Sequence, residues 1–574
     1  MVSVCNVMAK GYRNTLFTKV KTPNVPLNKF DLSYENLLSA GMGKLYPILC
    51  KEMLPGDRFR VKSDMLIRAM PMTSPVYGNL KAYVHYFFVP NRLVWSNWEE
   101  FITGGPNGED THVPPYTTLC DLLRDDYASV AVRYPGNDSQ LAAAYRALEG
   151  TISDYLGLPS YNGESSSVVL LYDKTPISLL PFRAYSLIWN EYYRDQNVDD
   201  EIDIQKDVDG YVGVEQDPST SVYRLPFDYH LMRRRRWLKD YFTSALPTPQ
   251  RGPDVSLPIV DSGSAIVADG NLYLKGTGTV GENNILIPNP GSVAESEFTI
   301  ASAPQDSPGV PAIEGTQYSK GLKLQQGSLI SATINDLRQA IALQRFYEIS
   351  ARAGSRYIET ILGHFHVKSS DARLQRPEYI GGGVTPITIS EVPQTSATDE
   401  TSPQGNLAGR GLGFGRTNQA IYRAEEHGYL IGIMSIIPEP VYYQGINKSF
   451  SRLQRDQYYW PSFAHLGEQP ILKPELFVDP TASEDQSQLL FGYAPRYAEY
   501  KYSPNEIHGL MRSSLSNWTF ARKLDAANLN SEFLEVPAVN NPFAVQDDTD
   551  KFVIWISHNI DALRPMPFFG TPSL

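Results

Sequence analysis

The chain has 574 residues and a formal net charge of −12, with 42% hydrophobic and 20% charged residues. This balance excludes an intrinsically disordered chain, and the acidity argues against a protein that binds nucleic acid over its whole surface. Three cysteines without a Cys-x-x-Cys pair exclude a disulfide framework and disfavour structural zinc. Because no apolar run is long enough to cross a bilayer, we expect a soluble product made in the cytoplasm.

The first segment, residues 1–30, is basic. It has no acidic residue, and its basic side chains are Lys10, Arg13, Lys19, Lys21 and Lys29. Since it shows no hydrophobic period, we predict an extended arm, with a disordered tail as the alternative.

Residues 31–101 are expected to form β-structure. Residues 58–62 alternate polar and apolar side chains, as a half-buried strand does. Residues 81–89 are rich in aromatic and β-branched side chains and end at a proline, which makes them the strongest strand candidate. Trp95, Trp98 and Phe101 then follow three apart, on one side of a predicted helical turn.

Helices are predicted at four places between residues 102 and 363. Segments 119–127 and 140–148 have helical composition within an insertion between strands. Over 181–195 an apolar stripe runs along one helix face. The strongest candidate covers 333–362, where a capping-box pattern precedes a periodic run that Gly363 ends.

Residues 252–325 differ from the rest of the chain, because small and β-branched residues dominate and basic residues are rare. We predict a small β-subdomain or long surface loop, with a plain linker as the alternative. The final third returns to β-structure, and 428–437 and 552–556 are its clearest strands.

Four consecutive arginines are the sharpest electrostatic feature. Arg233, Arg234, Arg235 and Arg236 repel one another unless anions neutralise them, and Lys239 lies close by. Phosphates would do so, and Trp237 could stack on an unpaired base. Salt bridges to a neighbouring subunit's acidic loop, residues 199–217, are an equally weighted alternative.

Enzymatic patterns are weak. His364 and His366 spell a metal motif of rolling-circle nicking enzymes, with Tyr493 and Tyr497 as nucleophiles, but Pro495 disfavours the helix that those tyrosines need. Residues 409–416 suggest a phosphate cradle, yet without the P-loop lysine a flexible loop is favoured. Residues 381–383 suggest a hinge or turn. We therefore expect no catalytic residue, metal or cofactor, and keep a nicking enzyme as the alternative function.

Several ordered segments resemble one family. They are Leu54-Pro-Gly-Asp-Arg-Phe59, the run from Tyr86 to Phe101, the aromatic stretch from Pro181 to Asp195, Trp237–Ala245 with Pro247, and Pro377–Gly382. Together they resemble the major capsid proteins of microviruses, in the gokushovirus-like branch. This resemblance implies a mainly β fold: a single eight-stranded antiparallel jelly roll with long helical and loop insertions between strands.

The resemblance also implies a structural role in the virion, not an enzyme. About sixty identical copies would enclose single-stranded DNA, together with minor virion proteins, after assembly in the bacterial cytoplasm. Residues 1–30 would be the basic arm, 31–251 and 326–574 the core, and 252–325 a protrusion that meets the host cell surface. The arginine block, Lys239, Lys10 and Arg13 are the predicted DNA contacts.

Overall fold

The computed structural model describes residues 26–105, 110–119, 121–122, 150–159, 175–216, 223–250, 252, 274–275, 284–285, 334–353, 375–393, 395, 407–481, 485, 488–547 and 549–569. The chain divides into two compact units. One consists of Met1–Pro249 with Ser350–Leu574, and the other is Gln250–Ile349. Within the described residues no helix has the length and apolar character that crossing a membrane requires.

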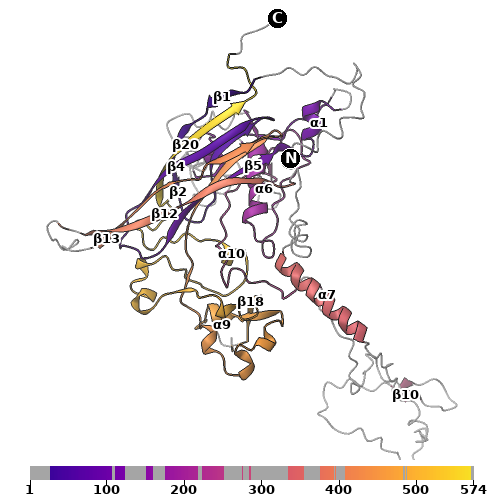
Figure 1. Ribbon diagram of the computed structural model, residues 1–574, viewed down its shortest axis with the longest axis vertical. Coiled ribbons are helices and arrows are strands. Elements are labelled where there is room, and N and C mark those ends of the chain that lie inside the picture. The colour runs from indigo at the N-terminus through magenta and orange to yellow at the C-terminus, as the bar shows by residue number, and fades with distance from the viewer. Residues whose placement is uncertain are drawn as a thin grey trace, which may run out of the picture. The chain divides into compact units, whose positions relative to one another are not determined.

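A ten-stranded antiparallel sheet dominates the first unit (Figure 1). Its strands are β1 (Asn28–Asp31), β2 (Tyr34–Ala40), β3 (Tyr46–Met53), β4 (Arg58–Ala69), β5 (Leu80–Pro90), β12 (Glu378–Pro393), β13 (Leu407–Arg416), β14 (Ala420–Arg423), β15 (Gly428–Pro438) and β20 (Phe552–Arg564). The order is β1-β20-β4-β13-β12-β5-β15-β3, while β2 pairs with β20 and β14 with β4. The expectation of a mainly β fold is confirmed.

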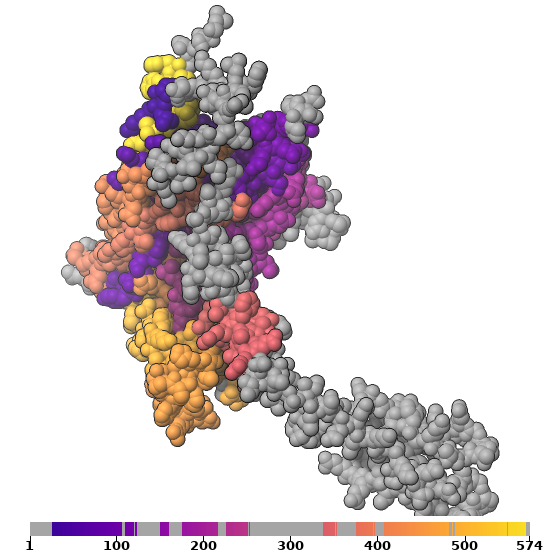
Figure 2. Space-filling view, turned by 45° about the vertical axis from the view of Figure 1, so that its right-hand side comes forward, coloured from indigo at the N-terminus to yellow at the C-terminus, as the bar shows by residue number. Residues whose placement is uncertain are grey.

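Strand β12 links the two halves of this sheet. Its first part pairs with β5 and its last six residues pair with β13, so one strand belongs to both halves. The sheet curls around a shared core to which both halves contribute, for example Phe59 and Ile554 from one and Ile48, Val84 and Leu430 from the other. Strands distant in sequence therefore meet, as the yellow and indigo atoms of β20 and the early strands do in Figure 2.

A helical layer covers the outer face of β5 and β15. It consists of α6 (Leu180–Ile188), which continues into a π-helical turn, η3 (Trp189–Tyr193). Tyr185 and Trp189 share a buried cluster with Phe87 and Ile431. Because both of its faces are covered, β15 is buried along nearly its whole length, whereas β4 and β20 alternate between buried and exposed residues.

The shorter helices, strands and loops of the first unit contribute side chains to a further buried hydrophobic cluster. Tyr241, Phe242, Ile471, Phe491 and Phe533 form a separate small core. The short strands are β6 (Tyr116–Thr118), β7 (Pro176–Ser178), β8 (Glu215–Gln216), β9 (Tyr223–Arg224), β16 (Val441–Tyr442), β17 (Glu468–Leu472), β18 (Leu490–Pro495) and β19 (Asn505–Glu506). The short helices are η2 (Asn91–Leu93), α1 (Trp98–Thr103), α4 (Ile152–Tyr155), η5 (Lys448–Phe450), η6 (Arg455–Gln457), η7 (Pro461–Phe463), α9 (Lys473–Leu476), η8 (Ala498–Tyr500), η9 (Gly509–Arg512), η10 (Ser516–Trp518) and α10 (Ser531–Leu534).

The second unit contains α7 (Ile334–Ala353) over most of its length, and the pair β10 (Leu274–Lys275) and β11 (Asn284–Ile285). Helix α7 confirms the prediction for residues 334–353, and 354–362 lie outside the described residues. Most of 252–325 and of the helices predicted at 119–127 and 140–148 also lie outside them. The protrusion therefore stays a prediction.

The strongest strand predictions are confirmed, and the observed strands are longer. The predicted strands 58–62, 81–89, 428–437 and 552–556 correspond to β4, β5, β15 and β20. The aromatic helix is confirmed as α6 and η3. Trp95, Trp98 and Phe101 do form one ring cluster, with centroids 5.4–6.3 Å apart.

Two glycine-rich predictions are wrong. Residues 409–416 were expected to be a flexible loop, but they lie in β13, and 381–383 lie inside β12 rather than in a hinge. The glycines of β13 recur every second residue and face inward. A Cβ at Gly411 would lie 2.7 Å from the Cβ of Ala69, and one at Gly415 would lie 2.0 Å from Oγ1 of Thr385. Close packing of neighbouring strands, rather than flexibility, explains these glycines.

Candidate nucleic-acid interface and assembly surfaces

The arginine block lies on an extended segment between two other pieces of chain. On one side Arg235 N donates to Gly43 O (2.6 Å), and Leu45 N donates to Arg233 O (3.0 Å). On the other side Val536 N donates to Arg235 O (3.0 Å). Gly43 has φ +77°, and a Cβ there would lie 2.2 Å from Val536 O, so only glycine permits this three-segment packing.

Arg235 is buried, with 7% of its surface exposed. Its guanidinium lies 4.2 Å from the ring centroid of Tyr83 and donates to Ser435 Oγ (2.6 Å). Burial lowers the pKa of Arg235, since the charged form loses hydration. A cation–π contact and one hydrogen bond replace part of that hydration.

Arg236 is the centre of an ion-pair network. Its Nε donates to Asp199 Oδ2 (2.7 Å), its Nη1 lies 2.7 Å from Glu535 Oε1, and its Nη2 donates to Ser531 Oγ (3.0 Å). The guanidinium also lies 5.4 Å from the ring centroid of Trp189. The sequence left open that the arginines form salt bridges with the acidic loop 199–217 of a neighbouring subunit. In the structure Arg236 forms such a salt bridge within its own chain, because Asp199 is the first residue of that loop.

The remaining members of the block also contact their own chain. Arg233 donates to Asp228 O (2.5 Å), and Arg234 donates to Val536 O (3.1 Å). Burial lowers the pKa of Arg233. Lys239 is paired with Asp195 but keeps 56% of its side chain exposed, the largest exposed fraction among the predicted DNA contacts that have an ion pair here.

The structure brings Arg233–Arg236 together, but the side chains of Arg235 and Arg236 are buried and expose little surface to a ligand. DNA binding by the block and by Lys239 stays a prediction, but the two carboxylate partners of Arg236 favour a structural role for that residue. Lys10 and Arg13 lie outside the described residues, as do His364 and His366. Tyr493 lies in β18 and Tyr497 follows it with a left-handed φ of +59°, so these two tyrosines do not share a helix.

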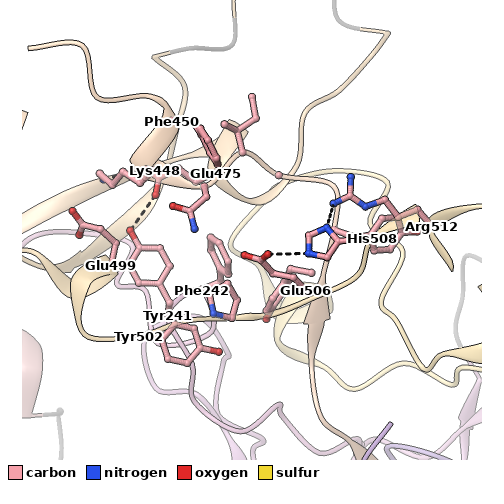
Figure 3. Close-up of a pocket in the computed structure, with 16 residues that line it drawn as sticks. Tyr241, Phe242, Lys448, Phe450, Glu475, Glu499, Tyr502, Glu506, His508 and Arg512 are labelled. Carbon is pink, nitrogen blue, oxygen red and sulfur yellow. Dashed lines mark hydrogen bonds and ion pairs between the residues drawn. The ribbon is translucent and has the colours of Figure 1, made fainter. Parts of the chain in front are cut away.

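A pocket of about 340 Å³ lies beside the small core, and sequence reasoning missed it (Figure 3). Tyr241 Oη donates to Glu475 Oε2 (3.1 Å), and Lys448 Nζ lies 3.1 Å from the other oxygen of Glu475. His508 Nε2 lies 3.3 Å from Glu506 Oε2. The carboxylates offset the basic groups, which disfavours an anionic ligand. No local sequence signal joins these residues, because they come from four separate segments.

Sequence reasoning also missed a row of apolar side chains across the outer face of the sheet. Leu37 on β2 pairs with Trp555 on β20, Trp555 with Leu66 on β4, and Leu66 with Phe414 on β13. Leu37 is 76% exposed and Phe414 is 69% exposed. We call these four residues the outer-face row. Trp555 and Leu66 between them are half-buried, so the row is apolar throughout and most exposed at its two ends. An apolar surface of this kind is typical of a contact with another molecule.

Comparison with known proteins decides the class. The sequence matches the family described as "Capsid protein (F protein)" over residues 18–574. The chain belongs to this phage capsid protein family. It is 34% identical to the capsid protein VP1 of Chlamydia phage 1, over 99% of this chain and 100% of that protein.

Two further relatives agree. Capsid protein VP1 of Bdellovibrio phage phiMH2K is 33% identical, over 92% of this chain and 89% of its own, and capsid protein VP1 of Spiroplasma virus 4 is 28% identical, over 97% of each chain. The resemblance to microvirus capsid proteins is therefore confirmed. This capsid protein is a structural component of the virion.

Proposed function

We propose that this capsid protein closes, in about sixty copies, into a small icosahedral shell around single-stranded DNA. The core would be a single eight-stranded jelly roll with inserted segments. Its support is the hydrogen-bonded path β1-β20-β4-β13-β12-β5-β15-β3, which β12 divides into two halves around one core. We propose no catalytic activity.

The outer-face row carries the proposal of self-assembly. Four apolar side chains cross four strands, and the isolated chain leaves both ends of the row open to solvent. Burying such a row against another copy would release water from apolar surface, at roughly 25 cal/mol per Å². Every copy in a closed shell would make the same contact. A modest free energy per contact would therefore be enough to stabilise the whole shell.

The experiment replaces Leu37 and Phe414 together by serine. We expect the unassembled chain to keep its far-ultraviolet circular dichroism and urea midpoint, because both side chains point to solvent, while particle formation falls steeply. Val113→Ser, an exposed apolar residue in a loop, is the matched control. Normal assembly of the double variant, seen by electron microscopy at equal concentration, would refute the role of the row.

We propose that the basic arm, residues 1–30, supplies the main DNA contacts. Among the arginine block and Lys239, Lys239 would be the exposed contact. The support is electrostatic: Lys10 and Arg13 lie in a segment without acids, whereas Arg236 already has two carboxylate partners. Replacing Lys10 and Arg13 by alanine should reduce the salt slope of single-stranded DNA binding by about 1.4, at about 0.7 per charge. Lys81→Ala, which removes a charge paired with Glu439 outside the arm, is the control, and an unchanged slope in the double variant would contradict us.

We propose that residues 252–325 form the outward protrusion that meets the host cell surface, and that minor virion proteins join the shell. Scarce basic residues and the separate compact unit Gln250–Ile349 support the first part. Deleting 252–321 should leave assembly intact and reduce attachment to host cells. Loss of assembly in this variant would count against a peripheral role.

A further inference from the structure

A cluster of one imidazole and two carboxylates lies away from the surfaces described so far. Glu100 on α1, and Asp110 and His112 on the loop that follows, bring one ligand atom each to within 4.8 Å of one another. Backbone bonds hold this loop in place, since Asp110 N donates to Gly104 O (3.0 Å) and Gly210 N donates to Val113 O (2.9 Å). The second bond sets residue 209 beside His112.

The orientation of the His112 ring is fixed by Asp209. His112 Nδ1 lies 2.7 Å from Asp209 Oδ2, and Asp209 in turn accepts hydrogen bonds from Trp95 Nε1 and from Asn97 Nδ2 (2.9 Å). An ionised carboxylate can only accept, so the short contact places a proton on Nδ1. The lone pair of Nε2 in the neutral ring then points toward Glu100 and Asp110, as in carboxylate–histidine–metal arrangements.

The distances on the Nε2 side suit an interposed ion better than direct hydrogen bonds. Nε2 lies 3.6 Å from Glu100 Oε2 and 3.8 Å from Asp110 Oδ1, both beyond the usual hydrogen-bond range of about 2.7–3.2 Å. Ligand atoms about 2.0–2.1 Å from a tetrahedral ion are about 3.3 Å apart. The three ligand atoms lie within 4.8 Å of one another and must approach further to bind one ion, and Glu100, 64% exposed at its side chain, is free to do so.

Asp110 gives an independent reason to expect a cation. Its side chain is only 8% exposed, and its Oδ2 has no hydrogen-bond partner within the described part of the chain. A buried carboxylate oxygen without a partner costs free energy. A metal ion in contact with the carboxylate would remove this cost.

We propose that His112 Nε2, Glu100 and Asp110 bind one divalent transition-metal ion of the Zn²⁺ class, with water at the remaining position and Asp209 as a positioning residue. The imidazole nitrogen favours Zn²⁺ over Ca²⁺, which prefers oxygen ligands alone. The ion would tie α1 to the 110–113 loop beside the Trp95 ring cluster. All four residues belong to one chain.

Zinc titration of the untagged, chelator-treated chain tests the site by calorimetry. We expect one Zn²⁺ per chain, and a loss of affinity of 10-fold or more in Glu100→Gln and His112→Gln. Asp209→Asn should weaken binding about 10-fold through the orientation of the ring. Glu99→Gln removes the same charge from the neighbouring exposed position on α1 and should leave the affinity unchanged.

Cobalt provides a second readout. Co²⁺ in the site should give visible absorption bands of a low-symmetry, four-coordinate ion, and these bands should change in Asp209→Asn although Asp209 is not a ligand. Glu100→Gln keeps the test valid if His112→Gln does not fold, since Glu100 is exposed. Absence of stoichiometric Zn²⁺, equal affinity in Glu100→Gln, or a preference for Ca²⁺ would overturn the proposal and leave an ion-pair cluster around a protonated His112.

Discussion

Replacing Arg236 by methionine should destabilise the folded chain without weakening DNA binding. Methionine keeps much of the side-chain volume but removes the charge from a network in which Arg236 is 9% exposed and the Asp199 side chain 3% exposed. Removing one partner of a buried ion pair typically costs about 3–5 kcal/mol, because the other charge stays buried alone. The equilibrium constant for unfolding should therefore rise by a factor on the order of 10²–10⁴.

Urea unfolding of the unassembled chain measures this change, with fluorescence from Trp189 and Trp237 reporting on the same region. The double variant Arg236→Met with Asp199→Asn should recover part of the loss, since the buried Asp199 charge is then gone, while Glu535, 34% exposed at its side chain, keeps contact with water. Lys29→Met is the control: it breaks a pair with Asp561 in which both side chains are exposed, 62% and 40%, and should cost less than about 1 kcal/mol.

The reasoning fails if Arg236→Met unfolds at the wild-type urea midpoint. It also fails if that variant instead reduces the salt slope of single-stranded DNA binding by about 0.7, because the guanidinium would then have served a phosphate rather than Asp199.

Three other outcomes follow from the structure. Gly43→Ala should destabilise the chain by about 2 kcal/mol or more, because its Cβ would meet Val536 O, whereas Gly157→Ala, also at positive φ but with nothing within 4 Å, should cost about 1 kcal/mol; thermal unfolding compares them. Burial lowers the pKa of His558 to about 4. The unfolded chain therefore binds a proton at His558 near pH 6.5, and the folded chain does so only near pH 4. This group alone should lower the free energy of unfolding by about 1.4 kcal/mol per pH unit between those values, and His85, whose pKa burial also lowers to about 4, adds a similar contribution. His558→Gln should reduce the total slope by about 1.4 kcal/mol per pH unit, and an unchanged slope in urea titrations would contradict the assignment. Finally, the Arg416–Asp64 pair is exposed on the arginine side. Arg416→Met should therefore change the free energy of unfolding, measured by urea titration, by less than about 1 kcal/mol.

The parts of the fold that the sequence predicts are those in which local pattern and burial agree. Strand β5 has aromatic and β-branched residues because both of its faces are covered, and β4 alternates because one face meets solvent. The aromatic helix was predictable for the same reason. Its π-helical turn was not, because the extra residue per turn is set by packing around Trp189 and Tyr193 rather than by local propensity.

Other features depend on contacts that a single sequence does not display. The inward glycines of β13 resemble a flexible loop until Ala69 and Thr385 are seen opposite them. The arginine block suggested phosphate, yet one of its two carboxylate partners, Asp199, comes from 37 positions earlier in the chain. His112 and Asp209 are 97 positions apart, so no motif joined them. The outer-face row exists only once the register of four strands is known.

The hydrogen bond between Ser63 on β4 and His558 on β20 has a consequence for synthesis on the ribosome. These residues are 495 positions apart, and at about 5–20 residues per second the ribosome needs roughly 25–100 s to travel from one to the other. Throughout that interval β4 has a long open edge, a template for unwanted strand addition by neighbouring nascent chains. A host that translates many copies at once would therefore gain from chaperones that shield this edge until β20 emerges.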